Sequence, residues 1–123
     1  MEVLPTAPVV AGDCALPAPH GTAPDVVTTL GLLPDGAVIT TVEQRDGGRT
    51  VITATAPTPF TELLDRVRAG YTAHGLTQLN GEAENGDAES DFTGQGYKGR
   101  WGLRQVNGCP TNTTISVVVA KDG

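Results

Sequence analysis

The sequence predicts an α+β domain in which one amphipathic helix packs on one face of an antiparallel sheet of about six strands, in the order β-β-α-β-β-β-β. Three observations predict this fold. Two β-rich runs flank a glycine-rich bend, one segment carries apolar residues at helical spacing, and three further bends divide residues 76–120 into four strands. The 123 residues have room for one domain, which we assign to residues 34–123.

The first 33 residues differ from the rest in composition. Five prolines between residues 4 and 24 fix φ and remove backbone hydrogen-bond donors, which favours an extended tether over residues 1–33. Cys14 lies within this tether, and the second cysteine, Cys109, lies in a Gly-Cys-Pro turn. We expect a Cys14–Cys109 disulfide that pins the tether to the domain and places the protein outside the reducing cytosol. Two separate buried thiols are the alternative.

Residues 37–56 predict a hairpin. Its two β-rich runs, 37–44 and 49–56, are separated by Asp46-Gly47-Gly48. Strict alternation places Val38, Val42 and Val51 on one face of the hairpin and its other apolar residues on the opposite face. Both faces therefore carry apolar residues.

The helix is expected to follow directly. Thr58 is the predicted N-cap, Pro59 occupies the first helical position, and Gly75 supplies the left-handed stop. Glu62 and Arg66 lie four residues apart on the side predicted to face water. The apolar stripe of this helix consists of Phe60, Leu63, Leu64, Val67 and Tyr71.

The four strands after the helix form a meander whose bends set the register. Two-residue turns at Asn85-Gly86 and Gln95-Gly96 place Phe92 opposite both Leu79 and Gly99, and Ser90 opposite Trp101. The last strand, 113–120, closes the sheet. The face that the helix should cover carries Leu79, Phe92, Trp101 and Leu103.

On the reverse face the same register brings charged residues of neighbouring strands together. Solvated cross-strand ion pairs are one interpretation, and the expected pairs are Asp91–Arg100 and Asp87–Arg104. A site for a hard cation such as Ca²⁺ is the other interpretation, because carboxylates project from the same face. Its candidate ligands are Glu82, Glu84 and Glu89, with Glu82 opposite Glu89.

The residues do not form a recognisable catalytic or cofactor-binding motif. A serine triad would have to use Ser90 or Ser116 with His20 or His74, and Ser90 is expected to fill space beside the indole in the core. We therefore expect no catalytic residues and no cofactor. Residues 112–114, Asn-Thr-Thr, match the acceptor pattern for N-glycosylation.

The charge balance limits the partners. Eight Lys and Arg residues against fourteen Asp and Glu residues give a net charge of −6, which opposes binding to nucleic acid or to an anionic membrane. The sequence contains no run of about 20 apolar residues, so we expect membrane attachment only through an anchor upstream of this sequence.

The segment Asp91-Phe-Thr-Gly-Gln-Gly-Tyr-Lys-Gly-Arg-Trp101, followed by Gly108-Cys-Pro110, resembles small secreted or lipid-anchored α+β domains of high-GC Gram-positive bacteria. The resemblance extends from residue 34 to residue 119. It implies a location at the cell envelope after a proline-rich tether, and it implies no activity. Residues 11–14, Ala-Gly-Asp-Cys, depart from a lipobox at Asp13, so the mode of anchoring stays open.

These features favour a non-catalytic extracytoplasmic binding or sensor module whose partner is a small molecule, a peptide or an envelope protein. The alternative is an accessory enzyme subunit, or one completed by a partner chain, that uses the acidic face to bind a cation.

Overall fold

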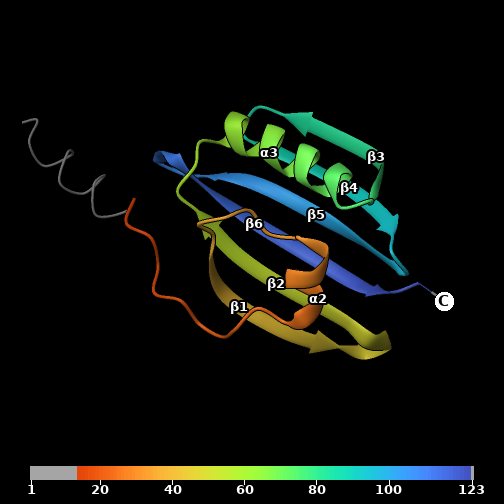
Figure 1. Cartoon of the computed structure of the whole chain (residues 1–123). Helices are drawn as coiled ribbons and strands as arrows, with labels where there is room; N and C mark the ends of the chain where they lie inside the picture. Colours follow the sequence, from red (N-terminus) through yellow and green to blue (C-terminus); the bar gives the residue numbers. More distant parts are fainter. Residues whose placement is uncertain (1–13, 123) are drawn as a thin grey trace, which may run out of the picture.

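The computed structural model describes residues 14–122, which form one antiparallel sheet of six strands with two helices on one face (Figure 1). The predicted α+β class and strand–helix order are confirmed, with one additional short helix. The strands lie in the order β1-β2-β6-β5-β4-β3. The elements are α2 (Asp25–Leu30), β1 (Val38–Arg45), a 3₁₀ turn (Asp46–Gly48), β2 (Arg49–Ala56), α3 (Phe60–Ala73), β3 (Thr77–Glu84), β4 (Asp87–Gly94), β5 (Tyr97–Val106) and β6 (Cys109–Lys121).

The core lies between the two helices and the covered face of the sheet. The whole predicted apolar stripe of α3 is buried, and Trp101 of β5 is 1% exposed. Full burial of one large apolar side chain contributes roughly 1.5–3 kcal/mol, so this interface dominates the stability of the fold. The sheet contributes mainly Ile52, Phe92, Trp101, Leu103, Ile115, Val117 and Val119.

The start of α3 differs from the prediction. Pro59 occupies the N-cap position and makes no side-chain hydrogen bond to the helix, so Thr58 is not the cap. Thr58 is buried instead, and its carbonyl oxygen accepts a 2.8 Å hydrogen bond from the Thr113 hydroxyl. The predicted end is confirmed, because Gly75 has a φ of 79°.

Residues 25–32 belong to the packed domain, which corrects the extended tether predicted over residues 1–33. The side chains of Val27, Leu30 and Leu32 are buried in the core, because α2 turns its apolar side toward the sheet. α2 ends at Gly31, whose φ is 62°. Residues 1–13 of the predicted tether lie outside the described residues.

The register of β4 against β5 is confirmed. Ser90 lies opposite Trp101, and Phe92 lies opposite Gly99. The last strand is longer than the predicted 113–120, because β6 begins at Cys109, and its buried apolar residues lie on the covered face.

The register of β3 departs from the prediction. An irregularity between Leu79 and Glu82 places Gln78, not Leu79, opposite Phe92, and leaves Leu79 46% exposed. The side-chain Oε1 of Gln78 accepts a 3.1 Å hydrogen bond from Trp101 Nε1. A leucine at this point would leave the indole N–H without a partner, so the shifted register satisfies a buried donor.

A second irregularity lies in β1, between Ile39 and Thr41. This irregularity places Val42 opposite Ile52, on the covered face. Strict alternation would place Val42 on the other face of the sheet.

Candidate functional site

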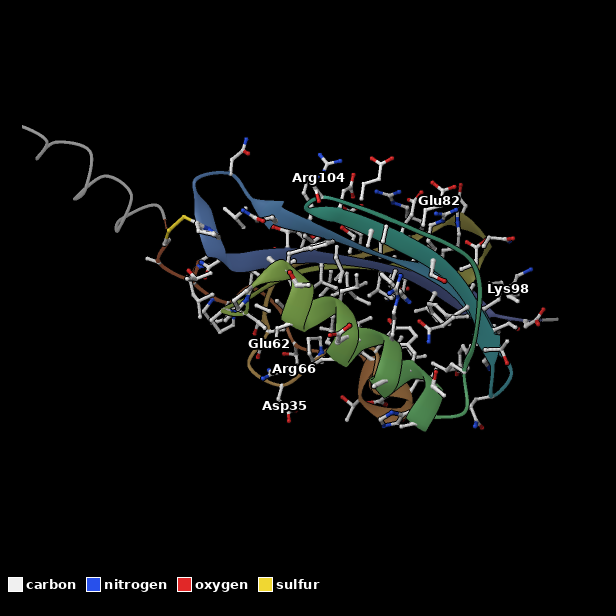
Figure 2. All side chains as sticks on the ribbon, turned by 90° about the horizontal axis from the view of Figure 1, so that it is seen from above. Asp35, Glu62, Arg66, Glu82, Lys98 and Arg104 are labelled. Atoms are coloured by element: carbon white, nitrogen blue, oxygen red, sulfur yellow. A yellow bond between two sulfur atoms is a disulfide. The ribbon has the colours of Figure 1, made fainter. Side chains whose placement is uncertain are left out.

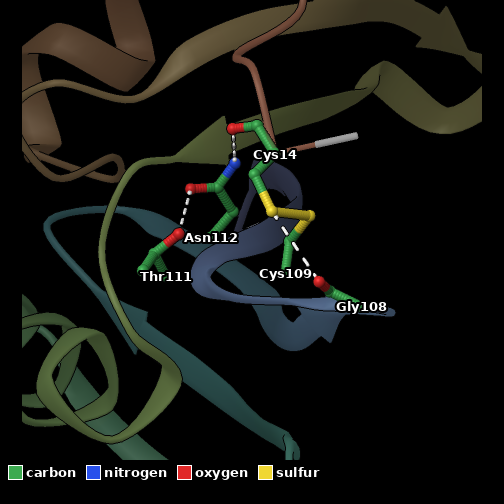
Figure 3. The surroundings of a disulfide bond; sticks show 5 residues. All are labelled: Cys14, Gly108, Cys109, Thr111 and Asn112. Carbon is green, nitrogen blue, oxygen red and sulfur yellow. Dashed lines mark hydrogen bonds between the residues drawn. A yellow bond between two sulfur atoms is a disulfide. The ribbon is translucent and has the colours of Figure 1, made fainter. Parts of the chain in front are cut away.

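The predicted Cys14–Cys109 disulfide is present, with 5.3 Å between the two Cα atoms (Figure 3). Asn112 reinforces this attachment, because its Nδ2 donates a 2.7 Å hydrogen bond to the Cys14 carbonyl oxygen. Asn112 is 4% exposed, so the amide of the glycosylation pattern is not accessible in the folded protein.

The charged residues of the open sheet face form the predicted ion pairs. Arg104 lies 3.4 Å from Asp87, and Arg100 lies 3.1 Å from Asp91 and 2.9 Å from Glu89. All of these side chains keep much of their surface in water, so each pair contributes only about 0.2–1 kcal/mol.

The cation-site interpretation receives no geometric support. Figure 2 shows Glu82 and Arg104 on the open side of the sheet, and Glu82 faces Glu89 as predicted. Among residues 14–122, however, no three His, Cys, Asp or Glu side chains are grouped closely enough to hold a metal ion. Glu82, Glu84 and Glu89 therefore share a face without forming a ligand set.

The residues considered for a serine triad are not brought together. Ser90 is buried, and its hydroxyl lies within hydrogen-bond distance of the carbonyl oxygens of Leu79 (3.1 Å) and Asp91 (3.0 Å). Ser116 lies exposed on the open face. In the part of the chain that the structure describes, no hydrogen bond joins either serine to His20 or His74.

A concave feature lies on the helix-covered side, between α2, the loop after it, β1 and α3. It is a cleft of about 780 Å³. Ligand-binding clefts in proteins commonly span roughly 300–1,000 Å³ and combine an apolar lining with a few polar groups. The apolar lining comes mainly from Val27, Leu32, Leu33, Ile39, Val67 and Tyr71.

Local sequence signals hold the walls of this cleft in place. Gly31 reverses the chain after α2, and a Cβ at this position would lie only 2.5 Å from the His74 ring. The Tyr71 hydroxyl donates a 3.0 Å hydrogen bond to the Leu32 carbonyl oxygen and ties α3 to the loop. Burial raises the pKa of this hydroxyl far above its usual range, so Tyr71 acts as a neutral donor.

Charged and polar side chains mark the two ends of the cleft. At one end, Asp35 lines the cleft next to Gly36, where a Cβ would lie 3.9 Å from Pro57 Cδ, in the segment before α3. Arg66 lines the same cleft, two helical turns before His74, or roughly 12 Å along the axis. His74 closes the other end, and its Nδ1 lies 2.8 Å from the Gly70 carbonyl oxygen.

Arg66 and Asp35 do not neutralise each other. Arg66 pairs with Glu62, as predicted from their spacing, and no ion pair within residues 14–122 includes Asp35. Figure 2 shows Asp35, Glu62 and Arg66 on the helix-covered side of the molecule, opposite Glu82.

The cleft does not follow from the predicted organisation of the chain, because the tether predicted over residues 1–33 includes α2. The signal was present: Val27 and Leu30 are three residues apart, and Gly31 follows at the position of a helix stop.

None of the described helices is long and apolar enough to cross a membrane. No family model matches the chain, and comparisons with curated proteins and with solved structures find no match.

Proposed function

We propose that this protein is a non-catalytic extracytoplasmic binding module that takes a small molecule in the cleft between α2 and α3. The observation that carries the proposal is the cleft itself, which joins an apolar floor to charged groups at its rim. The disulfide fits an oxidising compartment, which supports the location outside the cytosol.

A cation-dependent accessory subunit has less support. Glu89 already forms an ion pair with Arg100. Among the described residues, Glu82, Glu84 and Glu89 are not grouped closely enough to hold a metal ion.

A thermal-shift screen of small metabolites, with Ca²⁺ as one arm, tests the proposal on the oxidised protein. We expect some small molecules to raise the melting temperature, because a ligand that binds only the folded state stabilises it, and Ca²⁺ to leave it unchanged. Each compound that binds should be recovered chemically intact after prolonged incubation.

Two tryptophan variants locate the site. Thr28 lines the cleft, whereas Thr29 is exposed on the same helix and does not line it. Thr28→Trp should block the cleft and weaken binding at least about tenfold, a change of about 1.4 kcal/mol. Thr29→Trp should leave binding unchanged. Binding that survives Thr28→Trp, stabilisation by Ca²⁺ alone, or turnover of a compound would contradict the proposal.

A further inference from the structure

We infer that the ligand of this cleft is an apolar amino acid or a short apolar peptide with a free ammonium and a free carboxylate group. The inference rests on the proposed binding function and adds the chemical class of the ligand. This class of ligand is indicated by the pair of charged side chains that line the cleft, together with the apolar floor of the cleft.

Two opposite charges line the cleft, one on α3 and one on the loop that follows α2. Arg66 offers a guanidinium group with several N–H donors, and its described ion pair with Glu62 uses only Nη2. A planar guanidinium binds carboxylates and phosphates through paired N–H donors. Arg66 can therefore bind the carboxylate of a ligand from the side that faces the cleft.

Asp35 supplies the complementary acceptor. Its carboxylate is exposed, comes from the loop opposite α3, and forms no ion pair with another described side chain. A purely anionic ligand would be repelled by Asp35, and a purely cationic ligand would be repelled by Arg66. A zwitterion satisfies both groups at once.

The floor of the cleft selects the body of the ligand. Val27, Ile39 and Val67 line the cleft with aliphatic side chains. Transfer of an apolar side chain from water onto this surface is favourable, and a glycine or alanine ligand would lose that contribution. The cleft also has room for a second residue beyond the first, which is why the class includes short peptides.

Binding of L-phenylalanine and L-leucyl-L-leucine, measured by isothermal titration calorimetry, tests the inference. We expect at least one of them to bind, and the two arms distinguish a free amino acid from a peptide. N-acetyl-L-phenylalanine lacks the ammonium group and L-phenylalaninamide lacks the carboxylate. Each of these should bind at least about tenfold more weakly than the zwitterion, as should glycine.

Matched variants assign the two charges. Arg66→Gln and Asp35→Asn should each weaken zwitterion binding at least about tenfold. Arg68→Gln and Asp65→Asn change exposed residues of α3 that do not line the cleft, so they should not affect binding. Glu62→Gln removes the same ion pair as Arg66→Gln but keeps the guanidinium, so it should bind normally.

Absence of binding by both zwitterions at millimolar concentration overturns the inference, as does equal binding of the acetylated or amidated forms. The inference also fails if the Arg66 and Asp35 variants bind normally. A different result separates this inference from the proposed function. If neither zwitterion binds, but another class of compound binds and Thr28→Trp abolishes that binding, this inference is wrong and the proposed function stands.

Discussion

Gly99 occupies a position in β5 that has no room for a side chain. A Cβ there would overlap the Val118 carbonyl oxygen and would lie 2.7 Å from the Phe92 ring. Gly102, three residues further along the same strand, has open space, since the nearest atom to its Cβ would be 3.9 Å away.

We predict that Gly99→Ala lowers the free energy of unfolding by about 1–3 kcal/mol, because backbone and ring must shift to admit one methyl group. Gly102→Ala should leave it unchanged or raise it by up to about 1 kcal/mol, because glycine is a poor residue within a strand. Urea unfolding of both variants measures the difference. Equal effects would show that the packing around Phe92 is looser than described.

Gln78 explains why the sequence could not predict the register of β3 at its first residues. Its side-chain amide accepts from Trp101 Nε1 and donates to the Arg68 carbonyl oxygen (2.9 Å) and to the Thr72 hydroxyl (3.1 Å). Apolar alternation favours Leu79 at the covered position. The polar bridge from β5 to α3 exists only once these elements are packed together, so the pattern within one strand does not reveal it.

At the scale of single elements, the irregularity in β3 depends on Asn80, which has a φ of 54°. Asparagine tolerates the left-handed region, whereas a β-branched residue does not. The Asn80 side chain also lies 3.3 Å from Asp91 across the strand pair.

Asn80→Val should therefore lower the free energy of unfolding by about 1–2 kcal/mol, the cost of a left-handed conformation at such a residue. Asn80→Gly should change it by no more than about 0.5 kcal/mol, because glycine adopts a positive φ freely and the lost hydrogen bond is exposed. Chemical denaturation of the two variants tests this, and similar losses in both would mean that the side-chain hydrogen bond, not the backbone conformation, determines their stability.

The helices differ in how far the sequence predicts them. α3 has fourteen residues with a regular apolar stripe, and its position follows from that periodicity. α2 has six residues, fewer than an isolated helix needs to be stable in water, so its formation depends on packing against the sheet. The cleft lies between these two helices, and a sequence reading that misses the shorter one cannot predict the site.

For the molecule as a whole, the disulfide joins residues that are 95 positions apart. Closing so long a loop restricts the unfolded chain strongly, and the chain-entropy model gives about 4–5 kcal/mol for it. Two cysteines allow a single pairing within the chain, and the structure contains this bond instead of the alternative of two separate thiols.

We predict that reduction lowers the free energy of unfolding by about 4–5 kcal/mol. Urea unfolding with and without a reducing agent measures the loss. Cys14→Ser should be equally destabilised and should no longer respond to the reducing agent. A loss below about 1 kcal/mol would indicate that the Asn112 hydrogen bond and the packing of α2 already hold this part of the chain in place.

The same bond determines how the domain carries tension. A pull applied between the residues before Cys14 and those after Lys121 passes through the sulfur atoms directly to the first residue of β6, and it bypasses residues 15–108. Both ends of this path lie on β6, so the already extended backbone of this single strand bears the load, and neither of its neighbours, β2 and β5, is pulled past it. With the sulfur bridge open, the same pull would first reach α2 and β1, and the cleft would be the first part of the molecule to come apart.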